Sequence, residues 1–379
     1  MTVIEKYLSE KLQNREDAGN LRRLSTSRAP VDFFSNDYLG FITDGIIAEK
    51  LSGYSVSQLK PGSTGSRLLS GNSLLVEALE KEIAEFHNAD AALIFNSGYD
   101  ANTGLINGIA NRHTTIVYDD LCHASIIDGI RLSHAANKYR FAHNNIADLE
   151  QKLAKAQGPL VVVVEAIYSM DGDMAPLKDI TEIAERYKAT LIVDEAHATG
   201  IFGEDGRGLV CMMGLEEKVF ARVHTFGKAL GCHGAAVLGS ELLKQYLINF
   251  ARSFIYTTAL PLHSVYAIQA AYNHMASPGF SNHKLKELIS FFREKIRSSA
   301  DSRWKGSISP IQAIIVGSNC DAKQLAAALQ NAGLQVSPIL HPTVPLGAER
   351  LRICLHSFNT KGEIDLLFKT IKENPCSAE

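Results

Sequence analysis

The chain has 379 residues, of which 46% are hydrophobic and 21% are charged, and its 38 Lys and Arg against 41 Asp and Glu give a formal net charge of −3. This composition is typical of a globular protein with a sizeable core, and it excludes disordered, collagen-like and coiled-coil chains. Because the charge is nearly balanced, the surface has no overall field to attract a polyanion, and we do not expect nucleic acid as a partner.

The cysteines are scattered and form no C-x-x-C pair, so the sequence predicts neither a zinc site nor a disulfide framework. They are Cys122, Cys211, Cys232, Cys320, Cys354 and Cys376. Residues 1–12 mix charged with apolar residues and lack the continuous apolar core of a signal peptide, and no later segment resembles a membrane span. We therefore expect a cytoplasmic protein with reduced thiols, without a metal or a membrane partner.

The first element expected is a short amphipathic helix over residues 3–12, because Ile4, Tyr7, Leu8 and Leu12 have helical spacing. We expect this helix to pack against the main body or a partner. From about residue 91 the pattern changes to short apolar runs that alternate with helical stretches, which is typical of a parallel sheet covered on both faces. The runs predict strands at 92–95, 115–118, 160–165, 190–193, 221–224 and 235–238.

The rest of the chain predicts a mainly helical stretch and then a small α+β domain. Its expected elements are helices at 241–251, 262–277, 283–299, 322–332 and 361–373, with strands at 311–316 and 351–355. The expected fold class is therefore α/β, with a mostly parallel central sheet in a large domain, a small α+β C-terminal domain and a short N-terminal helical segment. The expected domain boundaries are 1–45, 46–280 and 281–379.

Several candidate functional residues follow the predicted strands, at the edge where open α/β sheets bind ligands. Asp194 ends one strand and could pair with a cationic ring nitrogen, with His197 close enough to act on the same ligand. A metal site is less favoured there, because no second Asp and His cluster with ligand spacing lies nearby. Lys228 stands among small and apolar residues after another strand, where a desolvated amine could form a Schiff base, although most lysines are solvated surface charges.

Other candidates have a functional and a structural interpretation. His123 could stack on a planar ligand or exchange protons, or it could be a hydrogen-bonded core histidine. Gly98 opens a helix whose free N–H groups suit phosphate, whereas capping by Ser97 explains the same residues. Arg352, on a late apolar strand, suits a carboxylate or a surface ion pair. The Gly-rich stretch 62–67 matches neither the Walker pattern nor the dinucleotide fingerprint.

The order of these features resembles that of fold-type I enzymes that use pyridoxal 5′-phosphate and, more closely, that of the α-oxoamine synthase family. The resemblance runs from about residue 21 to beyond residue 360. It is carried by the stretches FSNDYLG (34–40), GSTGSR (62–67), NSGY (96–99), DLCHAS (120–125), SMDGD (169–173), DEAHATG (194–200) and TFGK (225–228). Within the family, the runs 225–237 and 255–261 are most similar to members that join L-alanine to a pimeloyl thioester in biotin synthesis.

The resemblance implies a fold-type I aminotransferase-like fold, pyridoxal 5′-phosphate as cofactor, and a role for each matching residue. Lys228 would hold the cofactor as a Schiff base and then move protons at the amino-acid Cα. Asp194 would keep the pyridine nitrogen protonated. His123 would stack over the ring, and His197 would bond its phenolic oxygen. Further cofactor contacts are expected from Gly98, Tyr99, Ser169, Thr225, Thr257 and Thr258.

The resemblance also implies the substrates and the assembly. Arg352 and Asn36 would hold the amino-acid carboxylate, and Arg22 would lie near the acyl substrate. The expected reaction condenses L-alanine with pimeloyl-CoA, or with a pimeloyl carrier thioester, and releases coenzyme A and CO2. The expected protein is a homodimer with shared active sites, in which Thr257 or Thr258 of a neighbouring chain reaches the phosphate.

Three alternatives stay open. A sister synthase would use glycine or L-serine with another acyl-CoA, as 2-amino-3-ketobutyrate ligase, 5-aminolevulinate synthase and serine palmitoyltransferase do. A non-catalytic binding protein on the same fold would have no need of Lys228, Asp194, His123, His197 and Arg352 together. A nicotinamide oxidoreductase would fit the α/β pattern, but the Gly fingerprint after a first strand is missing.

Overall fold

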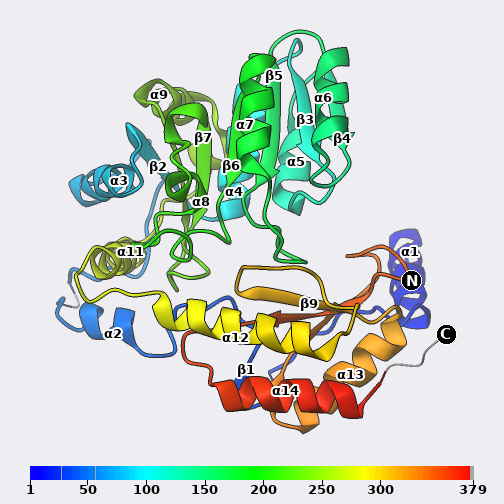
Figure 1. Cartoon of the computed structure of the whole chain (residues 1–379). Coiled ribbons are helices and arrows are strands. Elements are labelled where there is room, and N and C mark those ends of the chain that lie inside the picture. Colours follow the sequence, from blue (N-terminus) through cyan, green and yellow to red (C-terminus); the bar gives the residue numbers. More distant parts are fainter. Residues whose placement is uncertain (27, 56, 376–379) are drawn as a thin grey trace. The chain divides into compact units, whose positions relative to one another are not determined.

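The computed structural model describes residues 1–26, 28–55 and 57–375, so Cys376 lies outside the described residues (Figure 1). Its contacts divide the chain into two compact units. The large unit comprises Asn36–Ser169 and Met174–Lys284, and the small unit comprises Met1–Ser35, Met170–Asp173 and the chain from Leu285 onward. The sequence predicts functional domains at 1–45, 46–280 and 281–379, and these boundaries stay a prediction.

The large unit contains a sheet that is seven-stranded among the described residues. In spatial order its strands are β2 (Ala91–Phe95), β8 (Ala235–Gly239), β7 (Ala221–Thr225), β6 (Thr190–Asp194), β5 (Leu160–Glu165), β3 (Thr115–Asp119) and β4 (Asn137–Phe141). The pairs from β4 through β7 are parallel, and β8 is antiparallel to both of its neighbours. The expected α/β class with a mostly parallel sheet is therefore confirmed.

Burial explains why the apolar runs form the inner strands. In β5 the sequence LVVVVE is buried at every position after the first, because helices cover both faces of the sheet. β-Branched residues suit such a strand, since their restricted side chains pack well on a pleated surface. β4, one of the two edge strands, alternates between half-buried and exposed residues before it ends at the buried Phe141, and its sequence NKYRF is more polar accordingly.

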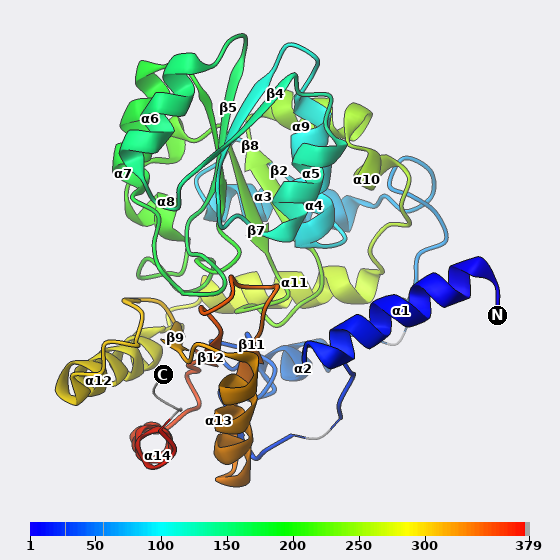
Figure 2. The same cartoon turned by 90° about the vertical axis from the view of Figure 1, so that its right-hand side faces the viewer.

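Helices cover the two faces of this sheet (Figure 2). In that view α6 and α7 lie on one face, and α4, α5 and α9 on the other. The helical elements of the large unit are α2 (Ile46–Leu51), α3 (Leu74–Phe86), α4 (Gly98–Ile109), α5 (Ala124–Leu132), α6 (Ile146–Lys155), α7 (Leu177–Arg186), α8 (Leu209–Met212), the 3-10 turn η1 (Glu216–Lys218), α9 (Glu241–Phe250), α10 (Arg252–Ile255) and α11 (Leu262–Met275).

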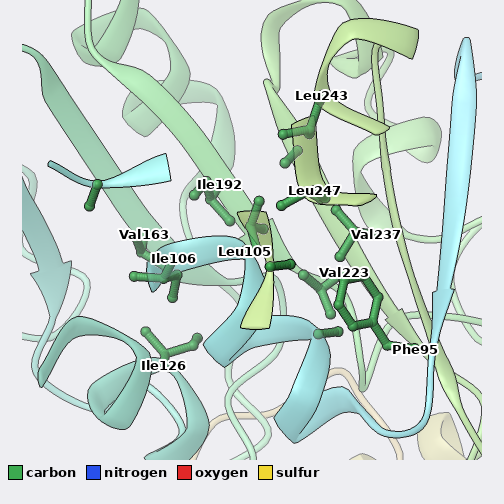
Figure 3. Close-up of a cluster of buried hydrophobic side chains, with 14 of the residues drawn as sticks. Phe95, Leu105, Ile106, Ile126, Val163, Ile192, Val223, Val237, Leu243 and Leu247 are labelled. Atoms are coloured by element: carbon green, nitrogen blue, oxygen red, sulfur yellow. The ribbon is translucent and has the colours of Figure 1, made fainter. Parts of the chain in front are cut away.

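A buried apolar cluster joins α4, α5 and α9 to the sheet (Figure 3). Leu105 and Ile106 of α4 and Val223 of β7 are fully buried in it. Each large aliphatic side chain buried in this way contributes about 1.5–3 kcal/mol. Because α4 is held by this cluster, the position of its first turn at the end of β2 is fixed by the core.

The small unit joins the beginning of the chain to its last part. β1 (Val31–Asp32) pairs in parallel with β10 (Leu334–Gln335), and an antiparallel sheet has the order β11 (Ser337–Ile339), β12 (Arg350–Cys354), β9 (Ile311–Ile315). Its helices are α1 (Val3–Asp17), α12 (His283–Ser299, which begins in the large unit), α13 (Asn319–Asn331) and α14 (Lys361–Glu373).

The helix expected at residues 3–12 exists and extends to Asp17, and Thr2 caps it with a capping box. It buries no residue within the described chain, so its packing against the main body is not observed, and its apolar residues Ile4, Tyr7, Leu8 and Leu12 are exposed. Across the described ranges, no helix combines the length and the apolar character needed to cross a membrane.

Candidate active site

The sheet brings the candidate residues of the large unit to one edge. Because β2, β3, β6 and β7 run in the same direction, their carboxyl ends meet there. Asp194 is the last residue of β6, and Lys228 and His123 lie shortly after the ends of β7 and β3. Gly98 begins α4 directly after β2, and a Cβ built on it would lie 2.4 Å from Thr225 Oγ1, so the first turn of α4 lies directly against the end of β7.

Lys228 is one end of a line of hydrogen-bonded side chains. Its Nζ lies 2.8 Å from His197 Nε2, and Nδ1 of the same ring lies 2.9 Å from the hydroxyl of Tyr38. The Tyr38 hydroxyl donates to Oδ1 of Asn36 at 2.8 Å. His197 is 4% exposed and Tyr38 is fully buried, so the side chains that support the lysine are shielded from water.

Asp194 is a buried carboxylate with both oxygens engaged. Oδ2 accepts a hydrogen bond from the side-chain amide of Asn102 at 2.7 Å, and Oδ1 accepts from the backbone N–H of Ala196 at 2.8 Å. With 5% of its surface exposed, Asp194 is held in one orientation. A fixed, buried carboxylate is suited to pair with a cationic group of a ligand.

His123 is held in place by one contact of its ring and one hydrogen bond of its backbone. Ring Nδ1 lies 2.8 Å from the hydroxyl of Ser125, and the backbone N–H donates to Oε1 of Glu165 at 2.5 Å. Although its own surface is exposed, partial desolvation by neighbouring atoms lowers the pKa of His123; the charge of Asp194 opposes this, and that of Lys228 adds to it. A neutral imidazole is therefore favoured, which suits stacking on a flat ring.

Glu165, at the end of β5, adds a second buried carboxyl group to this edge. Burial raises the pKa of Glu165 well above its usual range, and the negative charge of Asp194 raises it further, while Lys228 opposes both effects. Two carboxylates that are close together in a low-dielectric site do not ionise equally. The environment therefore favours a neutral Glu165.

The beginning of α4 is capped and also suited to an anion. Ser97 Oγ accepts a hydrogen bond from the N–H of Asp100 at 3.1 Å, so the capping interpretation of this stretch is correct. Gly98 and Tyr99 are in the first turn, whose N–H groups have no acceptor within a helix. The Tyr99 hydroxyl donates to Asp128 Oδ2 at 2.5 Å, so its side chain is held on the α5 side.

Thr257 and Thr258 follow α10 and are joined to the end of β2 within the same chain. The side-chain amide of Asn96 donates to Thr257 Oγ1 at 3.0 Å and to the carbonyl of Thr258 at 2.7 Å. Asn96 is two residues before Gly98, so both threonines are tied to the approach to α4. Their expected approach to a phosphate from a neighbouring chain stays a prediction.

The remaining predicted residues are Ser169, Arg352 and Arg22. Ser169 is half-buried in the segment after β5. Arg352, on β12 of the small unit, donates from Nη1 to Cys354 Sγ at 3.0 Å. The exposed Arg22 donates to Thr343 Oγ1 at 3.1 Å, also within the small unit. Their expected contacts with cofactor or substrate stay predictions.

Sequence reasoning did not single out four residues that shape this edge: Tyr38, Asn102, Ser125 and Glu165. Asn102 bonds both Ser125 Oγ, at 3.0 Å, and Asp194, so it connects the support of His123 with that of Asp194. A signal for Asn102 was present, because it is four residues after Gly98 and therefore on the same side of the helix.

Comparison with known proteins shows the family of this chain. The family model described as aminotransferase class I and II matches residues 29–371, and the chain belongs to this family. Within it, the chain is 40% identical over 388 residues to the 8-amino-7-oxononanoate synthase of Emericella nidulans, covering 96% of this chain and 94% of that protein. The resemblance to α-oxoamine synthases is thereby confirmed.

Two solved structures are similar over most of the chain. A serine palmitoyltransferase with its pyridoxal phosphate internal aldimine has a TM-score of 0.86 and 25% identity, covering 98% of this chain and 99% of that one. The 8-amino-7-oxononanoate synthase of Francisella tularensis has a TM-score of 0.74 and 29% identity, covering 90% of this chain and 98% of that one.

Proposed function

We propose that this protein condenses L-alanine with a pimeloyl thioester, using pyridoxal 5′-phosphate, to give 8-amino-7-oxononanoate, the free thiol carrier and CO2. The observation that carries the proposal is Lys228, whose amine lies 2.8 Å from His197 at the same sheet edge as the fixed carboxylate of Asp194. The similarity to the synthase of Emericella nidulans, at 40% identity over nearly the full length, supports the choice of reaction.

The residues at this edge fit the cofactor. The close approach of Gly98 and Thr225 forms a cradle that a side chain at position 98 would fill, and the first turn of α4 provides N–H donors for a phosphate. Asp194 would pair with the protonated pyridine nitrogen, and Lys228 is the amine that would bind the aldehyde carbon. His123 would lie over the ring, and Ser169, Thr225, Thr257 and Thr258 would contribute hydroxyl groups.

The bound cofactor supplies an electron sink for the carbanion formed at the amino-acid Cα. Lys228 Nζ takes the proton from Cα of L-alanine. The new C–C bond then joins Cα to the thioester carbonyl carbon, and the thiolate leaves. Loss of the carboxylate as CO2 is followed by proton return to Cα from Lys228, while one further proton, from solvent, neutralises the thiolate.

Arg352 and Asn36 would hold the substrate carboxylate, and Arg22 would lie near the acyl group. A guanidinium binds a carboxylate through two parallel hydrogen bonds, which would set the angle of the Cα substituents relative to the cofactor ring. We also propose a cytoplasmic homodimer in which each chain contributes Thr257 or Thr258 to the site of its partner.

The alternative is a sister synthase that uses glycine or L-serine. The structural similarity to serine palmitoyltransferase, at a TM-score of 0.86, favours this candidate. An assay of the purified protein with pyridoxal phosphate, pimeloyl-CoA and each of the three amino acids separates them by product mass. Product from L-alanine alone is expected, and product from glycine or serine in its place would replace the proposed substrate.

Lys228→Ala is expected to abolish both the visible absorbance of bound cofactor and the formation of product, because no other amine is proposed to bind the aldehyde. Lys218→Ala is the matched control, since Lys218 is an exposed lysine that pairs with Glu185 at 2.9 Å. The measurements are the absorbance spectrum after gel filtration and product formation by mass spectrometry. Wild-type turnover in Lys228→Ala would contradict the proposed mechanism.

A further inference from the structure

We propose that Tyr38 is a positioning residue that keeps Nδ1 of His197 protonated and thereby makes Nε2 the acceptor for the proton that Lys228 must lose before it reacts. The assignment of Lys228 as the reacting amine rests on the proposed function. The arrangement of Tyr38 and His197 is a property of the ligand-free chain.

The direction of the hydrogen bonds carries this inference. A tyrosine hydroxyl has one proton, and Tyr38 donates it to Oδ1 of Asn36 at 2.8 Å. The contact of 2.9 Å between the Tyr38 oxygen and His197 Nδ1 must then be made by an Nδ1–H of the histidine. A neutral imidazole with its proton on Nδ1 has its lone pair on Nε2, which faces Lys228 Nζ at 2.8 Å.

The proton transfer balances without another reactant. An N–H bond of the Lys228 ammonium breaks, an Nε2–H bond of His197 forms, and the positive charge moves from the lysine to the imidazole. The free amine can then attack an aldehyde carbon. The imidazolium has an N–H at each nitrogen: Nδ1–H still donates to Tyr38, and Nε2–H becomes available to the phenolic oxygen of the cofactor.

Burial keeps the Tyr38 hydroxyl in place beside Nδ1 of His197. Its ring is fully buried and His197 is 4% exposed, so bulk water does not replace the hydroxyl as the partner of Nδ1. Without that hydroxyl, the hydrogen bond that favours the Nδ1–H form of His197 is lost. The proton would then be free to sit on Nε2, and the ring would face the lysine with a donor instead of an acceptor.

The first test uses the ligand-free protein. Tyr38→Phe keeps the ring and removes the hydroxyl, and long-range ¹⁵N NMR of histidine-labelled protein reads which nitrogen of His197 has the proton. The wild-type signal, assigned by its loss in His197→Asn, is expected to show a protonated Nδ1. In Tyr38→Phe the pattern is expected to shift toward a mixture, and an unchanged Nδ1–H pattern would overturn the proposal.

The second test measures the rate at which free pyridoxal phosphate is captured, followed by visible absorbance. Losing one hydrogen bond of this kind is expected to slow capture by about 2- to 10-fold in Tyr38→Phe. Tyr38→Phe is expected to have no further effect in a His197→Asn background, because it acts through His197. An equal slowing in that background would overturn the proposal.

Tyr272→Phe is the matched control for both tests. Tyr272 is 3% exposed and its hydroxyl also contacts a buried histidine, His87, at 2.9 Å, so the variant loses a hydrogen bond of the same type. It is expected to change neither the NMR pattern of His197 nor the rate of capture. If the wild-type protein captures no pyridoxal phosphate, the proposed function is wrong, and the NMR test still decides the role of Tyr38.

Discussion

Replacing Glu195 by Gln is expected to change how the stability of this protein depends on pH. Glu195 is fully buried, and its Oε1 accepts hydrogen bonds from the backbone N–H groups of Leu209 and Val210 at 2.6 and 3.0 Å. Its Oε2 faces His224 Nε2 at 3.4 Å, and neither atom has a hydrogen-bond partner among the described residues. Burial raises the pKa of Glu195 from 4.5 to about 7.

The size of the effect follows from this shift. The difference between 7 and 4.5 is 2.5 pKa units, which at about 1.36 kcal/mol per unit corresponds to about 3 kcal/mol. Because the folded protein keeps this proton more tightly than the unfolded chain does, the contribution is present below pH 4.5 and is lost as the pH rises through about 7. Burial also lowers the pKa of His224, so a neutral histidine faces the carboxyl group.

Glu195→Gln removes the titration but keeps the geometry. The amide oxygen can still accept from the two backbone N–H groups, and the amide nitrogen can donate to His224. The free energy of unfolding of the variant, minus that of the wild type, is expected to rise by about 3 kcal/mol between pH 4.5 and pH 8. Contributions from buried histidines, such as His87, whose pKa burial lowers to about 3, are shared by both proteins and cancel in the difference.

The assay is urea unfolding followed by circular dichroism at a series of pH values. Glu182→Gln, at an exposed position of α7, is the control and is expected to follow the wild-type profile. A difference between Glu195→Gln and wild type that stays constant within about 1 kcal/mol from pH 4.5 to pH 8 would refute this account of Glu195.

Two further predictions concern packing and a buried ion pair. Gly98→Ala is expected to cost about 1–3 kcal/mol of unfolding free energy, because its Cβ would lie 2.4 Å from Thr225 Oγ1. In a Thr225→Ala background the cost in urea unfolding should be smaller, and an equal cost would contradict the steric explanation. Arg350→Met is expected to cost about 3–5 kcal/mol, since it leaves the buried carboxylate of Asp171 without its cation. Thermal unfolding measures this loss, and adding Asp171→Asn should recover part of it if the uncompensated charge is the cause.

The sequence predicted most of the central sheet because its strands are buried on both faces and are therefore apolar throughout. It did not predict β4, whose sequence NKYRF lacks the continuous apolar character of the inner strands. The antiparallel direction of β8 could not be predicted from the sequence either. β8 is as apolar as the parallel strands of the sheet, and strand direction depends on how the connections cross the sheet.

The motifs predicted which residues would gather at the sheet edge, and the structure places Asp194, Lys228, His123 and Gly98 there. Their proposed roles remain to be tested by experiment. The supporting contacts were harder to predict, since they join distant segments. Tyr38 contacts a histidine 159 positions away, and no local pattern of charge or hydropathy encodes such a partner.

The pairing of β1 with β10 has a consequence for how the chain is made. Val31 pairs with Leu334, so about 300 residues must be synthesised between the two strands. At about 5–20 residues per second, a ribosome takes about 15–60 s to cover that distance. β1 therefore leaves the ribosome before its partner β10 has been synthesised, and it cannot form this pairing while the large unit is produced. Completion of the small unit is timed by the end of translation, and a delay in elongation would lengthen the exposure of that edge to chaperones or to other nascent chains.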